Sequence, residues 1–410
     1  MISNPRTVNI FGATGSVGQR TLEILESAGQ PYQINALTAN DDYEALARLA
    51  RRHTPKKIIL ANKEKINNLN QLLGDINVSV SAGREALLQV AQEPVDWTMA
   101  AISGMAGLEP LYHSIRHSKI VAIANKEPLV AAGPLIMKLA TEKGTKLLPV
   151  DSEHNALFQL LEGSQRAKIK DIVLTASGGP FLKRDLNDFD AITPEEAVAH
   201  PQWSMGAKIS VDSATLMNKA LEVIEAAYFF NFKADQVRVR IHPQSLIHAM
   251  LMTEAGDCTA HLSAPDMGGP IAHAWHWPES GSSDAKKLTL SDLNDLTFKD
   301  VCSKRFPALK LAYEALNKGL YACIAMNAAN EIAVHAFLNG NIAFTAIVPA
   351  VAKIMKAAPE KEFGAASNVK SDINAICAYD KDIRAMTESY LDGQRQNGDS
   401  AETQKKTAIL

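Results

Sequence analysis

Short apolar runs alternate with longer amphipathic segments over the first 150 residues. Six runs have the length and the apolar content typical of β-strands. They cover 7–12, 32–38, 56–61, 97–103, 119–125 and 145–150. Segments with helical spacing of apolar residues, such as 16–27 and 83–92, lie between them. This alternation predicts right-handed crossovers and therefore an α/β domain over residues 1–150, with a Rossmann-like, doubly wound parallel sheet.

The pattern changes after residue 150. Strand-like runs occur at 170–177, 237–243 and 248–253, and helical spacing at 213–230 predicts one long helix. Residues 151–277 are therefore expected to form a central α+β domain.

Small and polar residues gather at 278–302, which we interpret as a linker. Two segments with helical spacing follow and end at Gly319 and Gly340, which predicts a C-terminal helical bundle over 303–395. The polar residues 396–410 are expected to form a flexible tail.

Composition is that of an ordinary globular protein. The 410 residues are 46% hydrophobic and 21% charged, which suffices for two or three domains. A net charge of -3 without long basic runs argues against a nucleic-acid partner. The absence of a run of about 18 apolar residues argues against a membrane span. Four scattered cysteines without CxxC spacing indicate reduced thiols and a cytoplasmic protein.

A glycine-rich segment follows the first predicted strand. Gly12, Gly15 and Gly18 stand between that strand and the helix at 16–27, where backbone N–H groups and a helix N-terminus meet a pyrophosphate. The spacing is GxxGxxG and not GxGxxG, and such glycines also occur in simple tight turns. The strand before and the helix after favour dinucleotide binding.

The end of the second strand bears on the choice between NAD and NADP. An acid there favours a free ribose 2′-hydroxyl, and a base favours a 2′-phosphate. Asp41 and Asp42 lean towards NAD, but they also suit the N-cap of the next helix. Asn40, Arg51 and Arg52 are nearby candidates for a phosphate contact. These residues leave the choice open.

Acidic residues follow the last strand of the first domain. Asp151 and Glu153 are two positions apart, so on an extended segment both project to one side and begin a divalent-metal site. Glu222 offers a third carboxylate, with Asn218 and Lys219 on the same part of its helix. Helix capping and surface ion pairing are the structural alternatives. The location at the carboxyl end of a strand favours a site.

A second polar group suits a substrate phosphate. Ser177 ends a strand and precedes two glycines, which allow a backbone to turn closely around a ligand. Ser213, Asn218 and Lys219 add a hydroxyl, an amide and a cation. A plain Gly-Gly-Pro turn is the alternative for Ser177.

A short loop between proline and glycine carries large apolar side chains. Trp203 and Met205 have no alternation that would place them in a core, so we interpret the loop as a lid over the site. His200, in the same loop, is a candidate for phosphate contact or proton transfer. His242 and His248 fall in strand patterns and are interpreted as structural.

Six motifs together resemble the 1-deoxy-D-xylulose 5-phosphate reductoisomerase family. They stand in the family's order from Gly12 to Met250: GATGSVG, ANKEPLVAAG, LPVDSEHNALFQ, TASGGPF, HPQWSMGAKISVDSATLMNKALEVIEA and IHPQSLIHAM. The third and fifth are long and specific. The resemblance implies a homodimer of V-shaped subunits, with an NADPH domain, a catalytic and dimerisation domain, and a helical bundle.

The same resemblance implies an activity. The family carries out a metal-dependent isomerisation of the sugar phosphate 1-deoxy-D-xylulose 5-phosphate. An NADPH-dependent reduction to 2-C-methyl-D-erythritol 4-phosphate completes this step of the non-mevalonate isoprenoid pathway. A semialdehyde dehydrogenase would need a positioned nucleophilic cysteine, which the sequence does not offer, and a non-catalytic dinucleotide sensor would not need three acids.

The resemblance also implies roles for residues. The ligands of Mg²⁺, Mn²⁺ or Co²⁺ would be Asp151, Glu153 and Glu222, which with Lys126 and His200 form the catalytic group. The substrate-binding residues would be Ser152, Glu153, Ser177, His200, Trp203, Met205, Ser213, Asn218, Lys219 and Glu222. The cofactor-binding residues would be Thr14, Gly15, Ser16, Val17, Asn40, Asn125, Glu127 and Gly206.

Two segments depart from the family pattern. Asn40, Asp41 and Asp42 stand where many members carry a Gly-Lys/Arg-Asn type segment near the 2′-phosphate, although NADPH remains the predicted cofactor. Gly268 stands where a basic residue is familiar. His154 is expected to lie behind the metal ligands and not to act as an acid or base.

Overall fold

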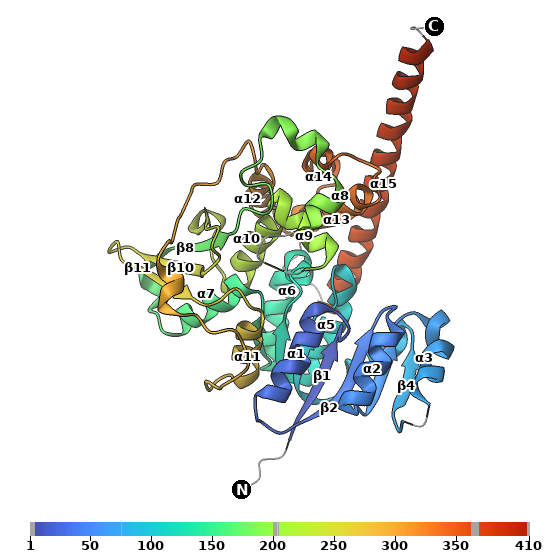
Figure 1. Cartoon of the computed structure of the whole chain (residues 1–410), viewed down its shortest axis with the longest axis vertical. Coiled ribbons are helices and arrows are strands. Elements are labelled where there is room, and N and C mark those ends of the chain that lie inside the picture. The colour runs from blue at the N-terminus through green and yellow to red at the C-terminus, as the bar shows by residue number, and fades with distance from the viewer. Residues whose placement is uncertain (1–4, 75, 200–202, 204, 362–368, 408–410) are drawn as a thin grey trace.

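The structure is a computed structural model and describes residues 5–74, 76–199, 203, 205–361 and 369–407. Within these residues the N-terminal part forms a seven-stranded sheet in the order β4-β3-β2-β1-β5-β6-β7 (Figure 1). All neighbouring strands are parallel. The strands are β1 Arg6–Phe11, β2 Tyr32–Ala39, β3 Lys57–Leu60, β4 Ser79–Ala82, β5 Val95–Ala100, β6 Ser118–Ile123 and β7 Lys146–Pro149.

Helices connect these strands as crossovers. They are α1 Ser16–Ser27, α2 Tyr43–His53, α3 Ile66–Leu73, α4 Arg84–Val90, α5 Leu108–His117 and α6 Glu127–Lys143. Ile10, Leu37 and Trp97 are fully buried in the sheet, as expected for strands covered on both faces. The predicted Rossmann-like, doubly wound α/β domain is confirmed. Strand β4 was not predicted, because it is short and lies at the sheet edge. Its exposed serines alternate with a valine and an alanine that are only partly buried.

The order of the strands reverses between β1 and β5, which is the place where open α/β sheets bind ligands. Gly12 follows β1 there with φ +79°, and a Cβ on it would lie 2.4 Å from the carbonyl oxygen of Ala101. Only glycine allows the loops after β1 and β5 to approach so closely.

The central part is a smaller mixed sheet with the order β11-β10-β8-β9. Its elements are α7 Ser152–Glu162, β8 Ile169–Ala176, α8 Pro194–Val198, α9 Ala207–Thr215, α10 Met217–Phe230, β9 Val237–Ile241, β10 Ile247–Thr253, β11 Cys258–Leu262 and α11 Gly268–His276. Helix α7 packs on β10 and β11, and α10 is buried along most of its length. The partly exposed edge strand β11 was not predicted. The expected α+β architecture is otherwise present.

The single long helix predicted over 213–230 is wrong. Leu216 takes a left-handed conformation, φ 63° and ψ 13°, and separates α9 from α10. Its side chain is buried in a small apolar cluster with Phe306, so tertiary packing supports a backbone conformation that leucine rarely adopts. Ser213 and Glu222 consequently belong to two different helices.

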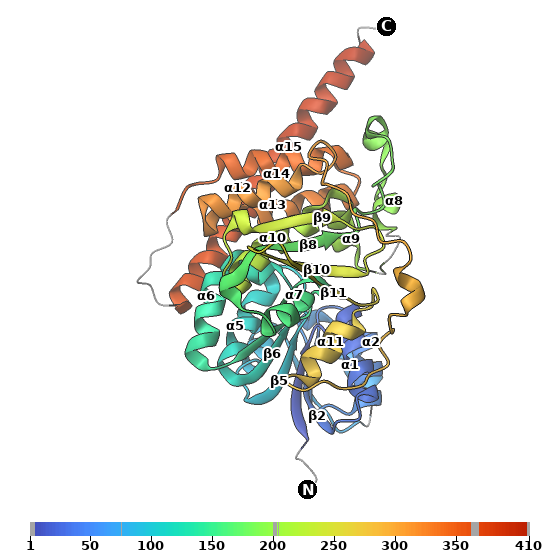
Figure 2. The same cartoon turned by 90° about the vertical axis from the view of Figure 1, so that its left-hand side faces the viewer.

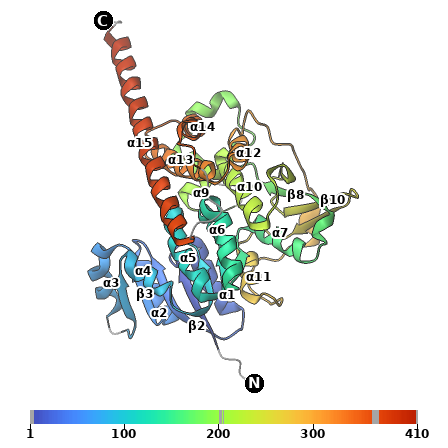
Figure 3. The same ribbon diagram turned by 180° about the vertical axis from the view of Figure 1, so that it is seen from behind.

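The helices that follow pack around α13 (Figure 2). They are α12 Ala308–Lys318, α13 Leu320–Leu338, α14 Ile347–Ala357 and α15 Val369–Thr407. Helix α13 contacts α12, α14, α15 and the α6 helix of the first domain, and α15 runs along this assembly and projects from it (Figure 3). The expected helical bundle is present, with Gly319 and Gly340 after α12 and α13. Helix continues to Thr407, into the segment predicted as a flexible tail, and the proposed domain boundaries remain a prediction.

Helix α11 returns from the central part to the N-terminal sheet. It packs on α1, and the Trp97 indole N–H donates to the carbonyl oxygen of Ala274 at 3.0 Å. The rings of Trp97 and Trp275 meet edge to face, 5.5 Å apart. This contact attaches α11, which also touches α7 of the central part, to the N-terminal sheet. Among the described residues, no helix has the length and apolar content needed to cross a membrane.

The packing of α1 on the glycine-rich turn gives a stability prediction. A Cβ on Gly18 would lie 2.3 Å from the Gly12 carbonyl oxygen and 2.6 Å from the Cα of Ala13. Gly18→Ala should lower the free energy of unfolding by about 2–3 kcal/mol, measured by urea denaturation, because backbone must shift. Gly163→Ala is the control, since nothing lies within 4 Å of its Cβ position and its φ is -90°. Equal stability of the two variants would contradict this account.

Candidate functional site

A cavity of about 380 Å³ lies where the two sheets, α1 and the α9–α10 turn meet. Most residues predicted for the site line it: Ser16, Val17, Lys126, Asp151, Ser152, Glu153, Ser177, Trp203, Met205, Gly206, Ser213, Asn218, Lys219 and Glu222. His200 lies outside the described residues. Elements far apart in sequence therefore bring the predicted metal, substrate and cofactor groups to one place.

Three carboxylates converge on the cavity wall. Oxygen atoms of Asp151, Glu153 and Glu222 lie within 4.8 Å of one another. The Lys126 ammonium is 2.8 Å from Asp151 Oδ2 and 3.0 Å from Glu222 Oε1. The Lys219 ammonium is 2.6 Å from Glu153 Oε1 and also contacts Glu222. Two ammonium groups thus balance part of the charge of three acids.

The charge pattern shifts the pKa of these groups. Burial and Glu153 raise the pKa of Glu222. Burial also acts to raise the pKa of Asp151, but Lys126 and His154 outweigh it and hold that pKa far below its usual range. The set is made of hard oxygen donors and carries more negative than positive charge. It therefore fits a divalent cation such as Mg²⁺.

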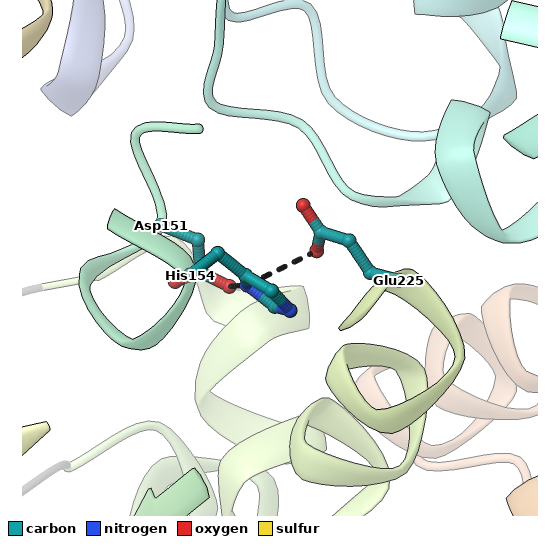
Figure 4. A group of neighbouring side chains, drawn as sticks. All are labelled: Asp151, His154 and Glu225. Carbon is teal, nitrogen blue, oxygen red and sulfur yellow. Dashed lines mark ion pairs between the residues drawn. The ribbon is translucent and has the colours of Figure 1, made fainter. Parts of the chain in front are cut away.

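The His154 ring lies beside Asp151 and faces Glu225 (Figure 4). His154 Nδ1 is 3.4 Å from Asp151 Oδ2 and 3.5 Å from Glu225 Oε2. Its Nε2–H donates to the Glu222 carbonyl oxygen at 3.0 Å. Burial lowers the pKa of His154, but Glu225 and Asp151 outweigh it and raise that pKa to about 9. The imidazolium therefore holds Asp151 and the Glu222 backbone together, and buried Glu225 is its counter-ion.

Glu225 was not identified from the sequence. Its spacing of three residues from Glu222 on a helix placed both on one side, but a second acid at that spacing is also common on exposed helices. Only the burial of α10 distinguishes the two cases, since Glu225 is 1% exposed.

The structure corrects the interpretation of His248 as purely structural. His248 lines the cavity, and its ring nitrogens lie 3.1 Å from Ser152 Oγ and 3.2 Å from the Ser263 carbonyl oxygen. It therefore orients a predicted substrate-binding hydroxyl. His242, whose Nδ1 donates to the Thr297 carbonyl oxygen at 2.9 Å, remains structural.

The residues predicted to bind the substrate phosphate, Ser177, Ser213, Asn218 and Lys219, also line the cavity. Gly179 has φ +68°, and a Cβ there would lie 2.8 Å from the Ser213 carbonyl oxygen, so the loop carrying Ser177 packs directly on α9. The Asn218 amide oxygen accepts from Lys126 at 2.7 Å. The Lys219 ammonium contacts carboxylates in this structure. Ser245, also on the cavity wall, was not predicted.

Some of the residues predicted to bind the cofactor line the cavity, and others hold the loops and helices next to it. Ser16 and Val17 line the cavity at the start of α1, whereas Thr14 and Gly15 form the preceding turn. The Asn125 amide donates to the carbonyl oxygens of Ile102 and Gly104 and so holds the loop after β5. The Glu127 carboxylate is 2.8 Å from the ammonium of Lys208.

Arg20 occupies the space around Gly268. It lines the cavity from α1 and forms an ion pair of 3.2 Å with Asp266. A Cβ on Gly268 would lie 2.6 Å from Arg20 Nη2. An arginine from α1 thus lies beside Gly268, which the sequence does not reveal because positions 20 and 268 are far apart along the chain.

The contacts at the end of β2 show what Asp41 and Asp42, the two acids that favoured NAD, bind in the structure. Asp42 caps α2 and accepts from the Ala45 backbone N–H at 2.9 Å. Asp41 accepts from the amides of Asn40 and Asn62 and lies 3.8 Å from the ammonium of Lys65. One acid is therefore a cap, and a cation accompanies the other. Lys65 was not identified because it comes from the segment after β3.

Family models match three stretches of the chain. They describe 1-deoxy-D-xylulose 5-phosphate reductoisomerase over residues 8–133, its C-terminal domain over 147–230, and the DXP reductoisomerase C-terminal domain over 262–386. The chain belongs to the 1-deoxy-D-xylulose 5-phosphate reductoisomerase family. The resemblance noted in its motifs is confirmed.

Individual relatives agree. The reductoisomerase of Zymomonas mobilis is 46% identical over 354 residues, 86% of this chain and 91% of the relative. That of Caulobacter vibrioides is 46% identical over 351 residues, covering 86% and 88%. A crystal structure of a reductoisomerase in complex with NADPH, fosmidomycin and magnesium superposes with a TM-score of 0.89 at 38% identity, covering 95% of this chain and 99% of the other. The structure of the Zymomonas mobilis enzyme in complex with NADPH superposes with a TM-score of 0.85 at 41% sequence identity, covering 95% of this chain and 99% of the other.

Replacing one carboxylate tests the metal cluster. Glu222→Gln keeps the size of the side chain but removes one of three charges, so Mg²⁺ affinity measured by calorimetry should fall by at least about tenfold. Glu162→Gln on α7, whose carboxylate accepts from the Trp277 indole, is the control and should bind Mg²⁺ normally. Wild-type affinity in Glu222→Gln would refute the ligand role.

Lys65 offers a test of cofactor selectivity. Lys65→Ala removes the cation beside Asp41, so the KM for NADPH should rise about tenfold while the KM for NADH stays nearly constant, because only NADPH carries the 2′-phosphate. Lys63→Ala, two residues away and paired with Glu85, serves as the control. Parallel changes for both cofactors would show that Lys65 does not read the phosphate.

Proposed function

We propose that this chain converts 1-deoxy-D-xylulose 5-phosphate to 2-C-methyl-D-erythritol 4-phosphate at the cavity between its two sheets. The observation that carries the proposal is the convergence of Asp151, Glu153 and Glu222 within one oxygen-rich cluster. The cluster lies beside the start of α1, where a dinucleotide binds in this fold. A reductase that also rearranges its substrate needs both groups in one cavity.

The chemistry divides between bound groups and the chain. A bound divalent metal ion polarises the substrate ketone, and NADPH supplies the hydride. Asp151, Glu153 and Glu222 would hold the metal ion. Although burial opposes it, Asp151 and Glu222 raise the pKa of Lys126 well above its ordinary value, so its ammonium stays protonated and is available to donate to a substrate oxygen. His248 orients the Ser152 hydroxyl towards the same region.

The phosphate end of the substrate would bind to hydroxyl, amide and ammonium groups on the cavity wall. Ser177 and Ser213 provide hydroxyls, and Asn218 and Lys219 provide an amide and a cation from the first turn of α10. Binding energy from this remote phosphate is available to order the reacting end. Trp203 and Met205, which line the cavity, would help to exclude water when the substrate is bound.

We further infer a cytoplasmic homodimer that accepts Mn²⁺ or Co²⁺ in place of Mg²⁺. Support for the compartment comes from the free state of Cys258, Cys302, Cys323 and Cys377. The all-carboxylate ligand set suits Mn²⁺ as well as Mg²⁺. Sedimentation analysis of the purified chain tests the dimer, which rests on the family resemblance.

A direct assay tests the function. The purified chain should oxidise NADPH only when 1-deoxy-D-xylulose 5-phosphate and Mg²⁺ are both present, and EDTA should reduce the rate by at least about a hundredfold, since the substrate then loses its Lewis acid. The control is a sample in which Mg²⁺ is restored in excess over EDTA. NADPH binding without turnover would instead favour a dinucleotide sensor. Mass spectrometry should identify 2-C-methyl-D-erythritol 4-phosphate as the product.

A further inference from the structure

Lys208, on the first turn of α9, bridges two buried carboxylates outside the cavity. Its ammonium lies 2.8 Å from Glu127 Oε1 at the start of α6 and 2.8 Å from Asp212 Oδ2 on α9. The side chain of Glu127 is 10% exposed and that of Asp212 is 1% exposed. Burial lowers the pKa of Lys208, but Asp212 and Glu127 outweigh it and raise that pKa above its ordinary value. The ammonium is therefore the electrostatic link between α6 and α9.

The link continues into the helical bundle. Asn330 of α13, which is fully buried, donates to Asp212 Oδ1 at 2.7 Å. Its neighbour Glu331 accepts from the Arg384 guanidinium of α15 at 2.6 Å, and Arg384 also binds Asp380 at 2.7 Å. Asn330 and Glu331, which lie in the predicted helical segment that ends at Gly340, thus belong to a network that joins four helices.

Both ends of this network adjoin the cavity. Glu127 directly follows Lys126, and Asp212 directly precedes Ser213, both of which line the cavity. Glu331 packs against the loop after β5, where a Cβ on Gly104 would lie 3.3 Å from its carboxylate. The same loop accepts a hydrogen bond of 3.0 Å from Asn125 at the Gly104 carbonyl. The network therefore contacts the cofactor side and the phosphate side at once.

Stability alone is a weak explanation for such a network. Burying charges costs desolvation energy, and apolar side chains of similar size often serve stability equally well. What Lys208 adds is a directional constraint. Without its charge, Glu127 and Asp212 would face each other as like charges, and the start of α9 would no longer be held at the start of α6.

We propose that Lys208 is a positioning residue that couples cofactor binding to binding of the substrate phosphate, by holding the Ser213-bearing helix α9 against the start of α6. This proposal rests on the function proposed above. A ligand that orders the loop after β5 and the α6 start also orders α9, so each ligand favours the other. Such coupling is reciprocal and has the same factor in both directions.

Binding measurements on the full-length chain test this coupling. The affinity for NADPH is measured by calorimetry with Mg²⁺, alone and with saturating 2-C-methyl-D-erythritol 4-phosphate. This pair does not react, because both ligands are in the reduced form. In the wild type the product should tighten NADPH binding by about tenfold, a typical coupling factor. In Lys208→Met the factor should fall to nearly one, while NADPH affinity without product changes less than about threefold.

Three further variants separate positioning from folding. Lys208→Arg keeps the charge and should restore most of the coupling. Lys310→Met removes an exposed lysine that has the same i,i+4 pairing on α12, with Glu314, and should keep the wild-type factor. If Lys208→Met fails to fold by circular dichroism, Asp212→Asn, which removes the same ion pair but keeps an amide, should halve the coupling factor or reduce it further.

Several outcomes overturn the proposal. They are a wild-type coupling factor of one, wild-type coupling in Lys208→Met, and wild-type coupling in Asp212→Asn when Lys208→Met does not fold. Failure of the proposed function is distinguishable, because it appears as absence of turnover of 1-deoxy-D-xylulose 5-phosphate by the wild type. If the wild type turns over substrate and Lys208→Met has the same coupling factor as the wild type, the proposed function stands but Lys208 has no positioning role.

Discussion

Mutual repulsion among three carboxylates, one buried and two partly buried, is the constraint on which the site depends. Two unit charges about 4 Å apart repel by about 4 kcal/mol at an effective dielectric constant of 20, far more than an exposed ion pair stabilises. Asp151, Glu153 and Glu222 lie together only because cations are built around them. Lys126 and Lys219 contact the acids from the cavity side, and His154 contacts them from behind. A divalent cation bound among the three carboxylates offsets the repulsion that remains between their oxygen atoms.

The fold provides this arrangement because two strand ends and one buried helix meet at the cavity. Asp151 follows β7, Lys126 follows β6, and Glu222 lies on the buried helix α10. Because the strands of the large sheet are parallel, their carboxyl ends share one edge, and the smaller sheet closes the cavity from the other side. Trp97 and Trp275 attach helix α11 to the large sheet, while Lys208 links the start of α6 to α9. Asp212 then links α9 to the helical bundle through Asn330.

Local rules anticipated a large part of this molecule. The alternation of strands and helices predicted the parallel sheet, since its period is set by the backbone geometry of each element. Gly12 and the helix after it indicated a dinucleotide site, because a glycine turn followed by a helix N-terminus is also a local feature of the chain. Local rules failed where neighbours in space decide, as at the short edge strands β4 and β11, and at Leu216, where packing against Phe306 overrides helix propensity.

The sequence by itself determined the fold class, the family and the residue types of the site, because strand rhythm and long motifs are local properties of the chain. Tertiary structure alone decided which charges meet. Lys65 beside Asp41, Arg20 over Gly268, Glu225 behind His154, and Lys208 between Glu127 and Asp212 all join positions separated along the chain or distinguished only by burial. Electrostatic energy depends on distance and dielectric environment, and both become defined only when the chain is folded.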